Sequence, residues 1–242
     1  MSKRPTVVSV LGELLITVGV FLLLFVAWEL WWTDIAAGRE QESVRNEVVQ
    51  QWEPDTDYEG EGADPAVVNG SGAWGFLYVP RLGAEWSVPV ADGVGSDVID
   101  RGLMGRYDVA SLPGEEGNLS LAGHRQTHGS ILWDLDQVVE GDVMYVQTAN
   151  GWWVYRTVQN HIVAPTQTEV LDPNPLDPGG PASGRWLTLT TCHPLFSTRE
   201  RMVTHAEYVS FIPTSQGPPE AIADAVAKNG TPELEPQAAG RT

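Results

Sequence analysis

Cysteine is almost absent from this chain, because Cys192 is the single thiol among its 242 residues. One cysteine excludes an internal disulfide framework. A lone cysteine is often a small buried hydrophobic side chain, so its presence alone does not indicate chemistry. The residues around Cys192 must decide whether the thiol is structural or reactive.

Basic residues are also scarce, with 14 Lys and Arg against 32 Asp and Glu, and the formal net charge is -18. Nucleic acids and anionic surfaces attract positively charged proteins, so this charge argues against both as partners. The chain has no internal repeat. Its length fits one sizeable domain with additional segments.

One long apolar run extends from Val7 to Trp28 and is interrupted only by Glu13. At ~1.5 Å per residue, a helix of this length reaches about the ~30 Å of a bilayer core. The run exceeds the roughly 7–15 apolar residues of a cleaved signal peptide, and no small-x-small cleavage site follows it directly. We therefore expect residues 7–32 to form a transmembrane anchor, in which Glu13 snorkels or is protonated.

Flanking residues indicate the orientation of this anchor. The basic Lys3 and Arg4 favour a cytoplasmic N-terminus (residues 1–6), and Trp28, Trp31 and Trp32 form an aromatic belt at the outer interface. The predicted protein is a single-pass cell membrane protein with everything after Trp32 outside. A free thiol in an exported domain is unusual enough to suggest a function.

The segment at residues 33–71 is predicted to join the anchor to a folded domain. Residues 33–51 are polar and can continue as a juxtamembrane helix, and residues 53–65 form an acidic spacer with Gly and Pro. Carboxylates in the spacer make a calcium site conceivable, but they are not spaced like a metal loop. We therefore expect a solvated linker.

The folded domain is predicted to span residues 72–213 and to be mainly β. Short apolar or alternating runs predict strands at 76–80, 86–90, 119–124, 143–146, 152–163, 186–192 and 201–209. Ser96 is positioned to cap a short helix that Gly102 ends. Leu132, Leu135 and Val138 have helical spacing.

The connections and the tail have weaker patterns. Residues 104–117 are predicted to be a loop, and residues 164–184 form a Pro/Gly/Asp-rich connection of the kind that is usually functional or mobile. The tail at 214–242 is rich in Pro, Ala and Gly, which predicts disorder with a weak helix at 219–227.

The run Trp186–Cys192 has the two-residue alternation of a strand. Leu187 and Leu189 face one side, whereas Thr188, Thr190 and Cys192 face the other, more polar side. Pro194 removes a backbone donor, so the strand should end just after the thiol and leave it at a rim.

Two further residues complete a candidate acyl-transfer site. His124 ends an alternating run beside a glycine, and a neighbouring imidazole and thiol can exchange a proton near neutral pH. Arg201 begins the next strand, and its guanidinium can donate to an oxyanion on an attacked carbonyl. Arg199 is its chief rival.

Other histidines compete with His124. His193 follows the thiol directly, and neighbours along a strand face opposite sides, so it is a poorer base. His205 faces the same side of its strand as Arg201, but it is expected to be packed or hydrogen-bonded. His128 and His161 are predicted to be loop and surface residues.

These motifs resemble the sortase family. Thr188–Cys192 is followed by Arg201 at the head of a strand and preceded by Leu121–His124 in an earlier one. The sequence most resembles those of the class E sortases of actinobacteria at residues 12–17, 28–32, 81–83, 190–194 and 205–209. The resemblance covers the apolar span and roughly residues 74–213.

The resemblance implies an eight-stranded sortase-type β-barrel with short helices and a cysteine transpeptidase activity without cofactor or metal. Cys192, His124 and Arg201 would be catalytic, while Tyr107, Thr190 and Thr191 would bind substrate. The connection at 164–184 would form a wall of the substrate groove. Partners would be secreted proteins with an LAXTG- or LPXTG-like sorting signal, cut between Thr and Gly, and an amine of a cell-wall precursor.

Three other interpretations stay open at this point. An L,D-transpeptidase would show Ser-His-Gly-Cys, whereas Thr190 and Thr191 precede Cys192. A papain-like peptidase would place its cysteine before its histidine. A non-catalytic peptide-binding ectodomain would leave Cys192 packed and resistant to mild alkylation.

Overall fold

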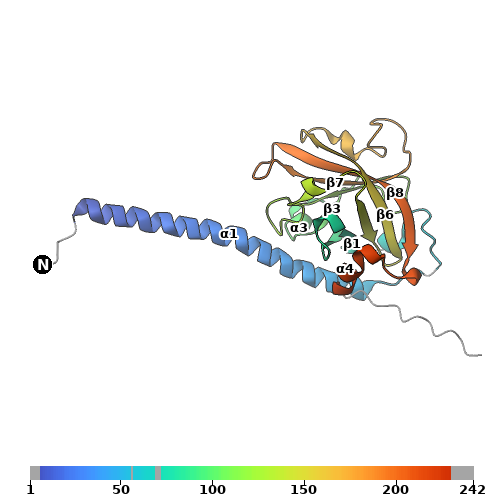
Figure 1. Ribbon diagram of the computed structural model, residues 1–242, viewed down its shortest axis with the longest axis horizontal. Coiled ribbons are helices and arrows are strands. Elements are labelled where there is room, and N and C mark those ends of the chain that lie inside the picture. The colour runs from blue at the N-terminus through green and yellow to red at the C-terminus, as the bar shows by residue number, and fades with distance from the viewer. Residues whose placement is uncertain (1–5, 56, 69–71, 230–242) are drawn as a thin grey trace, which may run out of the picture.

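A computed structural model describes residues 6–55, 57–68 and 72–229 as a closed barrel joined to one long helix (Figure 1). The predicted eight-stranded barrel is confirmed. The spatial order is β1-β2-β3-β4-β7-β8-β6-β5, and only the β2–β3 and β4–β7 pairs are parallel. Strand bounds are β1 (Ala73–Tyr78), β2 (Ser87–Asp92), β3 (Met104–Arg106), β4 (Gly117–Ala122), β5 (Val143–Gln147), β6 (Gly151–Val163), β7 (Arg185–His193) and β8 (Glu200–Pro213).

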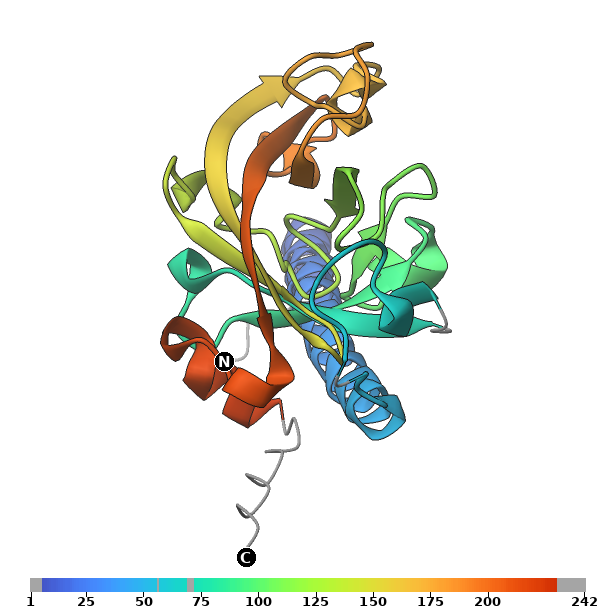
Figure 2. The same ribbon diagram turned by 90° about the vertical axis from the view of Figure 1, so that its right-hand side faces the viewer.

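The barrel interior is one hydrophobic core to which all eight strands contribute. Alternation along each strand sends every second side chain inward, as Leu187 and Leu189 do on β7. Representative core residues are Leu77, Val90, Met104, Leu121, Val146, Trp153, Leu189 and Ala206. The long strands β6 and β8 run side by side over their whole length (Figure 2).

The N-terminal helix α1 (Val7–Gln51) is continuous, so the expected anchor and juxtamembrane segments form one element. Its first part, Val7–Val26, is long and apolar enough to cross a membrane and packs against no other part of the described chain (Figure 1). Lys3 and Arg4 lie outside the described residues, as does the side chain of Trp31.

The second part of α1 packs against the barrel. Ala37, Val44 and Val48 lie on one face of the helix and are almost fully buried. A second hydrophobic cluster joins this face to outward-facing side chains of β1, including Phe76 and Tyr78. The polar sequence at 33–51 therefore contains a buried stripe that sequence analysis did not identify.

The acidic segment after α1 is not the solvated linker that we predicted. Asp64 is fully buried and accepts hydrogen bonds from Thr148, Asn150 and Trp153. Tyr58 packs edge-on against Phe211 of β8. The segment folds onto the barrel, including α2 (Pro65–Val68), so the ordered fold begins well before residue 72.

The predicted disorder of the tail is wrong for residues 214–229. The 3-10 helices η4 (Thr214–Gln216) and η5 (Glu220–Ile222) lead into α4 (Ala223–Lys228), which confirms the weak helix expected near 219–227. Ile222, Ala225 and Val226 are buried in the second cluster, and this burial orders the segment. Residues 230–242 lie outside the described chain.

Three local predictions need correction. The presumed loop at 104–117 begins with β3, whose three residues are ordered by pairing with β2 and β4. Gly95, not Ser96, caps α3 (Ser96–Ile99). The expected helix around Leu135 is reduced to η2 (Leu135–Gln137), although Leu132, Leu135 and Val138 are buried as predicted. The remaining 3-10 helices are η1 (Pro80–Leu82) and η3 (Thr168–Leu171).

Candidate functional site

Cys192 lies near the end of β7, on the outer face of the barrel. Leu187 and Leu189 point into the core, so the side chains at 188, 190 and 192 face outward, as the alternation predicted. Thr188 and Thr190 are buried on this outer face, whereas Cys192 is half-buried. The strand thus presents its thiol at the rim, next to a covered polar surface.

His124 arrives at the same rim from β4. The parallel ladder pairs Leu121 with Leu189 and Ala122 with Thr190, and the same register carried two residues further brings His124 level with Cys192. The chains stay together beyond the ladder, because Gly123 N donates to Thr190 O over 3.2 Å. Two adjacent parallel strands therefore deliver the imidazole and the thiol to one end of the barrel.

Arg201 lies directly opposite Cys192 in the antiparallel pairing of β7 with β8. Directly opposed residues point to the same face, with Cβ atoms about 4.5–5.5 Å apart. Its Nη1 donates to the carbonyls of Thr198 and Glu200, and its guanidinium carries three further N–H donors. Arg199 lies before the strand and is exposed, so the register favours Arg201 over its rival.

Asp100 is a residue of the site that sequence analysis did not find. As the C-terminal cap of α3, it places a carboxylate oxygen 2.7 Å from Nε2 of His124. The ring of His128 stacks on that of His124 with centroids 5.0 Å apart. The potential ligand atoms of Asp100, His124 and His128 all lie within 4.8 Å of one another. Sequence analysis missed the contact of Asp100 with His124 because the two residues are 24 positions apart.

Tyr107 and Thr190, two of the predicted substrate-binding residues, lie in contact, with hydroxyl oxygens 2.9 Å apart. Tyr107 is half-buried, whereas Thr190 and Thr191 are almost fully covered. The Thr191 hydroxyl donates to the Gly123 carbonyl over 2.7 Å. The two threonines thus tie β7 to the neighbouring strand, and of the three residues Tyr107 is the most available to a ligand.

The connection at 164–184 crosses the same outer face at the beginning of β4. Asn118 donates to the carbonyls of Val170 and Asp172, and its side-chain oxygen accepts from Thr188. These bonds hold the start of the connection against β4 and β7. The connection therefore borders the face on which Cys192 lies.

Arg125, like Asp100, was missed by sequence analysis, and it forms a hydrogen bond with His193. The buried Arg125 donates from Nη1 to His193 Nδ1 over 2.8 Å and from Nη2 to Asp136 over 3.0 Å. This contact supports the expectation that His193 is a poorer base for the thiol than His124. The signal available in the sequence was Arg125 itself, a charged residue directly after His124.

Two other histidines lie away from the rim. His205 is fully buried, as expected, and its Nδ1 lies 2.8 Å from the Thr188 hydroxyl. Desolvation, followed by the charge of His161, lowers the pKa of His205 to about 4. His161 lies in β6, within the strand predicted at 152–163, and the centroid of its ring is 5.1 Å from that of His205.

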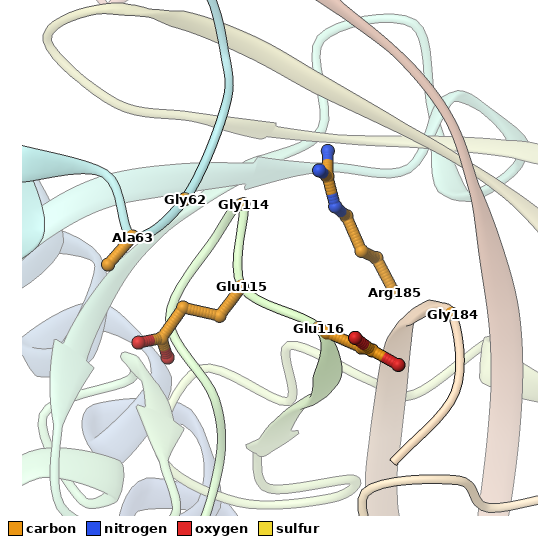
Figure 3. Close-up of a pocket in the computed structure, with 7 residues that line it drawn as sticks. All are labelled: Gly62, Ala63, Gly114, Glu115, Glu116, Gly184 and Arg185. Atoms are coloured by element: carbon orange, nitrogen blue, oxygen red, sulfur yellow. The ribbon is translucent and has the colours of Figure 1, made fainter.

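A hollow of about 710 Å³ lies elsewhere on the barrel (Figure 3). It is lined by Gly62, Ala63, Gly114, Glu115, Glu116, Gly184 and Arg185. Arg185 begins β7, whereas Cys192 lies seven residues later, so about 23 Å of strand separates them. Arg185 is bound to Glu61 over 2.7 Å, and the lining offers no nucleophile. The candidate catalytic residues therefore lie at the other end of β7, around Cys192.

Comparison with known proteins gives concordant matches. The family model described as the sortase domain matches residues 77–209. Sortase SrtE2 of Streptomyces coelicolor is 37% identical over 84% of this chain and 82% of its own length. Sortase SrtE1 of the same organism is 34% identical over 88% of this chain, which spans 60% of that relative.

A solved structure agrees with these sequences. Sortase E1 from Streptomyces coelicolor, crystallised with a tripeptide in the active site, superposes with a TM-score of 0.58 and 33% identity. The superposition covers 66% of this chain and 99% of that one. Since the family model covers more than half of the chain, and SrtE2 aligns over most of both proteins, the chain belongs to the sortase family, whose members are cysteine transpeptidases.

Proposed function

We propose that this chain is a membrane-anchored cysteine transpeptidase that cuts an LAXTG- or LPXTG-like sorting signal between Thr and Gly and transfers the protein to an amine. The observation that carries the proposal is the meeting of three strands at one rim. β7 brings Cys192, β4 brings His124, and β8 brings Arg201 opposite the thiol. The relative crystallised with a tripeptide in its active site supports a peptide substrate.

The first half-reaction forms a thioester. The Cys192 thiolate attacks the Thr carbonyl carbon, and the carbonyl oxygen becomes an oxyanion to which Arg201 donates. The tetrahedral intermediate then expels the Gly nitrogen, which takes a proton from His124 as the Thr–Gly bond breaks. The products are a Thr thioester on Cys192 and a peptide with a free amine.

The second half-reaction joins the carboxyl group to a new amine. The neutral amine attacks the thioester carbonyl carbon, and His124 takes up its proton. The C–S bond breaks, and the thiolate of Cys192 is restored. We propose that the amine belongs to a cell-wall precursor, because the relatives that support the family assignment are named class E sortases.

The anchor is part of the proposal. A bare apolar helix of 20 residues, Val7–Val26, is stable in a bilayer and is costly to expose to water. Lys3 and Arg4 favour a cytoplasmic N-terminus, which puts the catalytic domain outside the cell. Because Cys192 is the only thiol of this chain, a membrane-impermeant maleimide should label the chain in intact cells. The Cys192→Ala variant should stay unlabelled under the same conditions. Labelling only after cell lysis would contradict the orientation.

The central test uses the full chain in detergent micelles. It is incubated with LAXTG and LPXTG peptides, with and without a Gly-based amine, and analysed by mass spectrometry. We expect a Thr-terminated peptide adduct on Cys192, an amine-dependent ligated product, and neither with Cys192→Ala. A folded protein that forms no adduct with either peptide would contradict the proposal and make muropeptides the next substrates to try.

A further inference from the structure

At the end of the barrel that carries the thiol, the structure gathers three side chains with potential metal ligands, of which the acyl-transfer mechanism uses only His124. Asp100, His124 and His128 supply two imidazoles and one carboxylate, with ligand atoms within 4.8 Å of one another. We propose that these residues form a binding site for a late transition-metal dication such as Zn²⁺, and that the bound metal reversibly inhibits the enzyme. The inhibition, but not the binding, rests on the proposed function.

The donor set matches zinc chemistry. Zn²⁺ takes imidazole nitrogen at about 2.0–2.1 Å and carboxylate oxygen at about 2.0–2.2 Å, which separates neighbouring ligand atoms in a tetrahedral site by roughly 3.3–3.5 Å. The widest pair of the cluster therefore has to close by no more than about 1.5 Å. The three-residue spacing between His124 and His128 also falls within that of zinc-binding histidine pairs.

His128 gives independent support, because its position is not explained by hydrogen bonding. Its Nδ1 is buried without a hydrogen-bond partner among the described residues, which is costly for a polar atom. Its backbone has a φ of 51°, which is uncommon for a residue other than glycine. A metal ion bound to His128 would explain why its ring is held against that of His124.

The segments that carry the ligands are held by one stretch of α1. Asp34 accepts from Gly129 N over 2.9 Å, next to His128. Gln41 donates to the Gly102 carbonyl over 2.6 Å, and Glu40 pairs with Arg101, the residue after Asp100. Contacts to the same helix therefore fix the spacing of the two loops, which lowers the entropic cost of assembling the ligands.

Metal binding would remove His124 from catalysis. The Nε2 nitrogen, which now lies 2.7 Å from Asp100, would bind the ion, so His124 could no longer form the imidazolium that protonates the leaving amine. A chelator would restore activity because no covalent bond is made. Ca²⁺ and Mg²⁺ prefer all-oxygen ligands and should neither bind tightly nor inhibit.

The test measures metal uptake directly, on the full chain in detergent micelles. Zn²⁺ binding is followed by calorimetry, and Co²⁺ binding by its visible absorption. We expect one ion per chain, a Kd that rises at least about tenfold in His128→Asn, and an unchanged Kd in the control His161→Asn. Asparagine tolerates the left-handed backbone at 128. Asp100→Asn is the second variant and should weaken binding similarly.

The thiol is the main competing ligand, and Cys192→Ala tests it. Binding that survives in Cys192→Ala but weakens in His128→Asn supports the site. Binding that disappears in Cys192→Ala and persists in His128→Asn overturns it, as does a folded wild-type chain that takes up no zinc. Zinc uptake by a chain that processes neither peptide would refute the proposed function and leave the metal site standing.

Discussion

The phenol oxygen of Tyr107 lies 2.9 Å from the hydroxyl oxygen of Thr190, two residues before the thiol of Cys192. Tyr107 comes from the segment after β3, whereas Thr190 lies within β7. The contact fixes an aromatic ring over the outer face of the strand that carries the nucleophile. Either partner of this hydrogen bond can be changed separately.

Tyr107→Phe should separate a structural role from a substrate-binding one. Loss of the hydrogen bond should cost about 1 kcal/mol of stability, and the nearly isosteric Thr190→Val should cost a similar amount. If the phenol also binds the peptide, kcat/KM for LAXTG should fall about tenfold further in Tyr107→Phe than in Thr190→Val. Equal kinetic losses in the two variants would show that Tyr107 has only a structural role.

Arg201→Ala should lose acyl transfer by about a hundredfold or more, because the register places this guanidinium opposite Cys192. Arg199→Ala is the matched control, since Arg199 is exposed before the strand, and it should retain nearly full activity. The rate of thioester formation, followed by mass spectrometry, measures the effect. An active Arg201→Ala protein beside a dead Arg199→Ala protein would reverse the assignment.

The buried His205 should make the fold less stable in acid. Its pKa is lowered from 6.5 to about 4 in the folded state, so the unfolded chain takes up a proton that the folded chain refuses. Stability is therefore lost as the pH falls from 6.5 to 4, by about 3 kcal/mol in total.

Urea unfolding of a fragment from residue 33 onward, measured across this pH range, tests the effect. His205→Asn keeps a donor toward Thr188 and lacks the titrating group, so it should be less stable at pH 7 but less sensitive to acid. The difference between the two proteins isolates His205 from the many carboxylates of the chain. Parallel pH profiles would refute the prediction.

Asp64→Asn should destabilise the barrel by about 2–4 kcal/mol, although the change is small in volume. One oxygen of Asp64 accepts from Ala66 N and Asn150, and the other accepts from Thr148 and Trp153. An amide must therefore turn its NH2 group toward donors in either orientation. Burial raises the pKa of Asp64, so the four donors offset a desolvated charge.

Asp57→Asn, at an exposed position of the same segment, is the control and should change stability by less than about 0.5 kcal/mol. Thermal and urea unfolding provide the comparison. A fragment that begins at residue 72 removes Asp64 altogether and should be less stable than one that begins at residue 33. Equal stability of the two fragments would show that neither the packed half of α1 nor the segment at 57–68 stabilises the barrel.

The barrel was predictable because its strands alternate and because the motifs around Cys192 resemble a known family. The strand runs at 186–192 and 201–209 place Leu189 inward and Cys192 outward by parity alone, and the structure agrees. β3 was missed because three residues around a glycine carry too short a pattern to stand out from a loop. Its order comes from two neighbouring strands.

The predicted site was incomplete because contacts distant in sequence leave no local signal. Asp100 meets His124 across 24 residues, and Arg125 meets His193 across 68. Asp64 looked like one more acid in a spacer, yet its partners at 148, 150 and 153 make it part of the core. Composition describes such segments as solvated, and only tertiary packing reverses that interpretation.

If Val7–Val26 spans the membrane as we propose, helix α1 sets the distance between the bilayer and the rim that carries Cys192. From Val26, where the apolar part ends, Asp34 is about 12 Å along the helix and Gln41 about 23 Å. Since these two residues hold the loops beside His124, an anchored chain would keep this end of the barrel within about that distance of the lipid surface. Proteins confined to the same layer would meet Cys192 at a high effective concentration, whereas freely diffusing peptides would rarely do so.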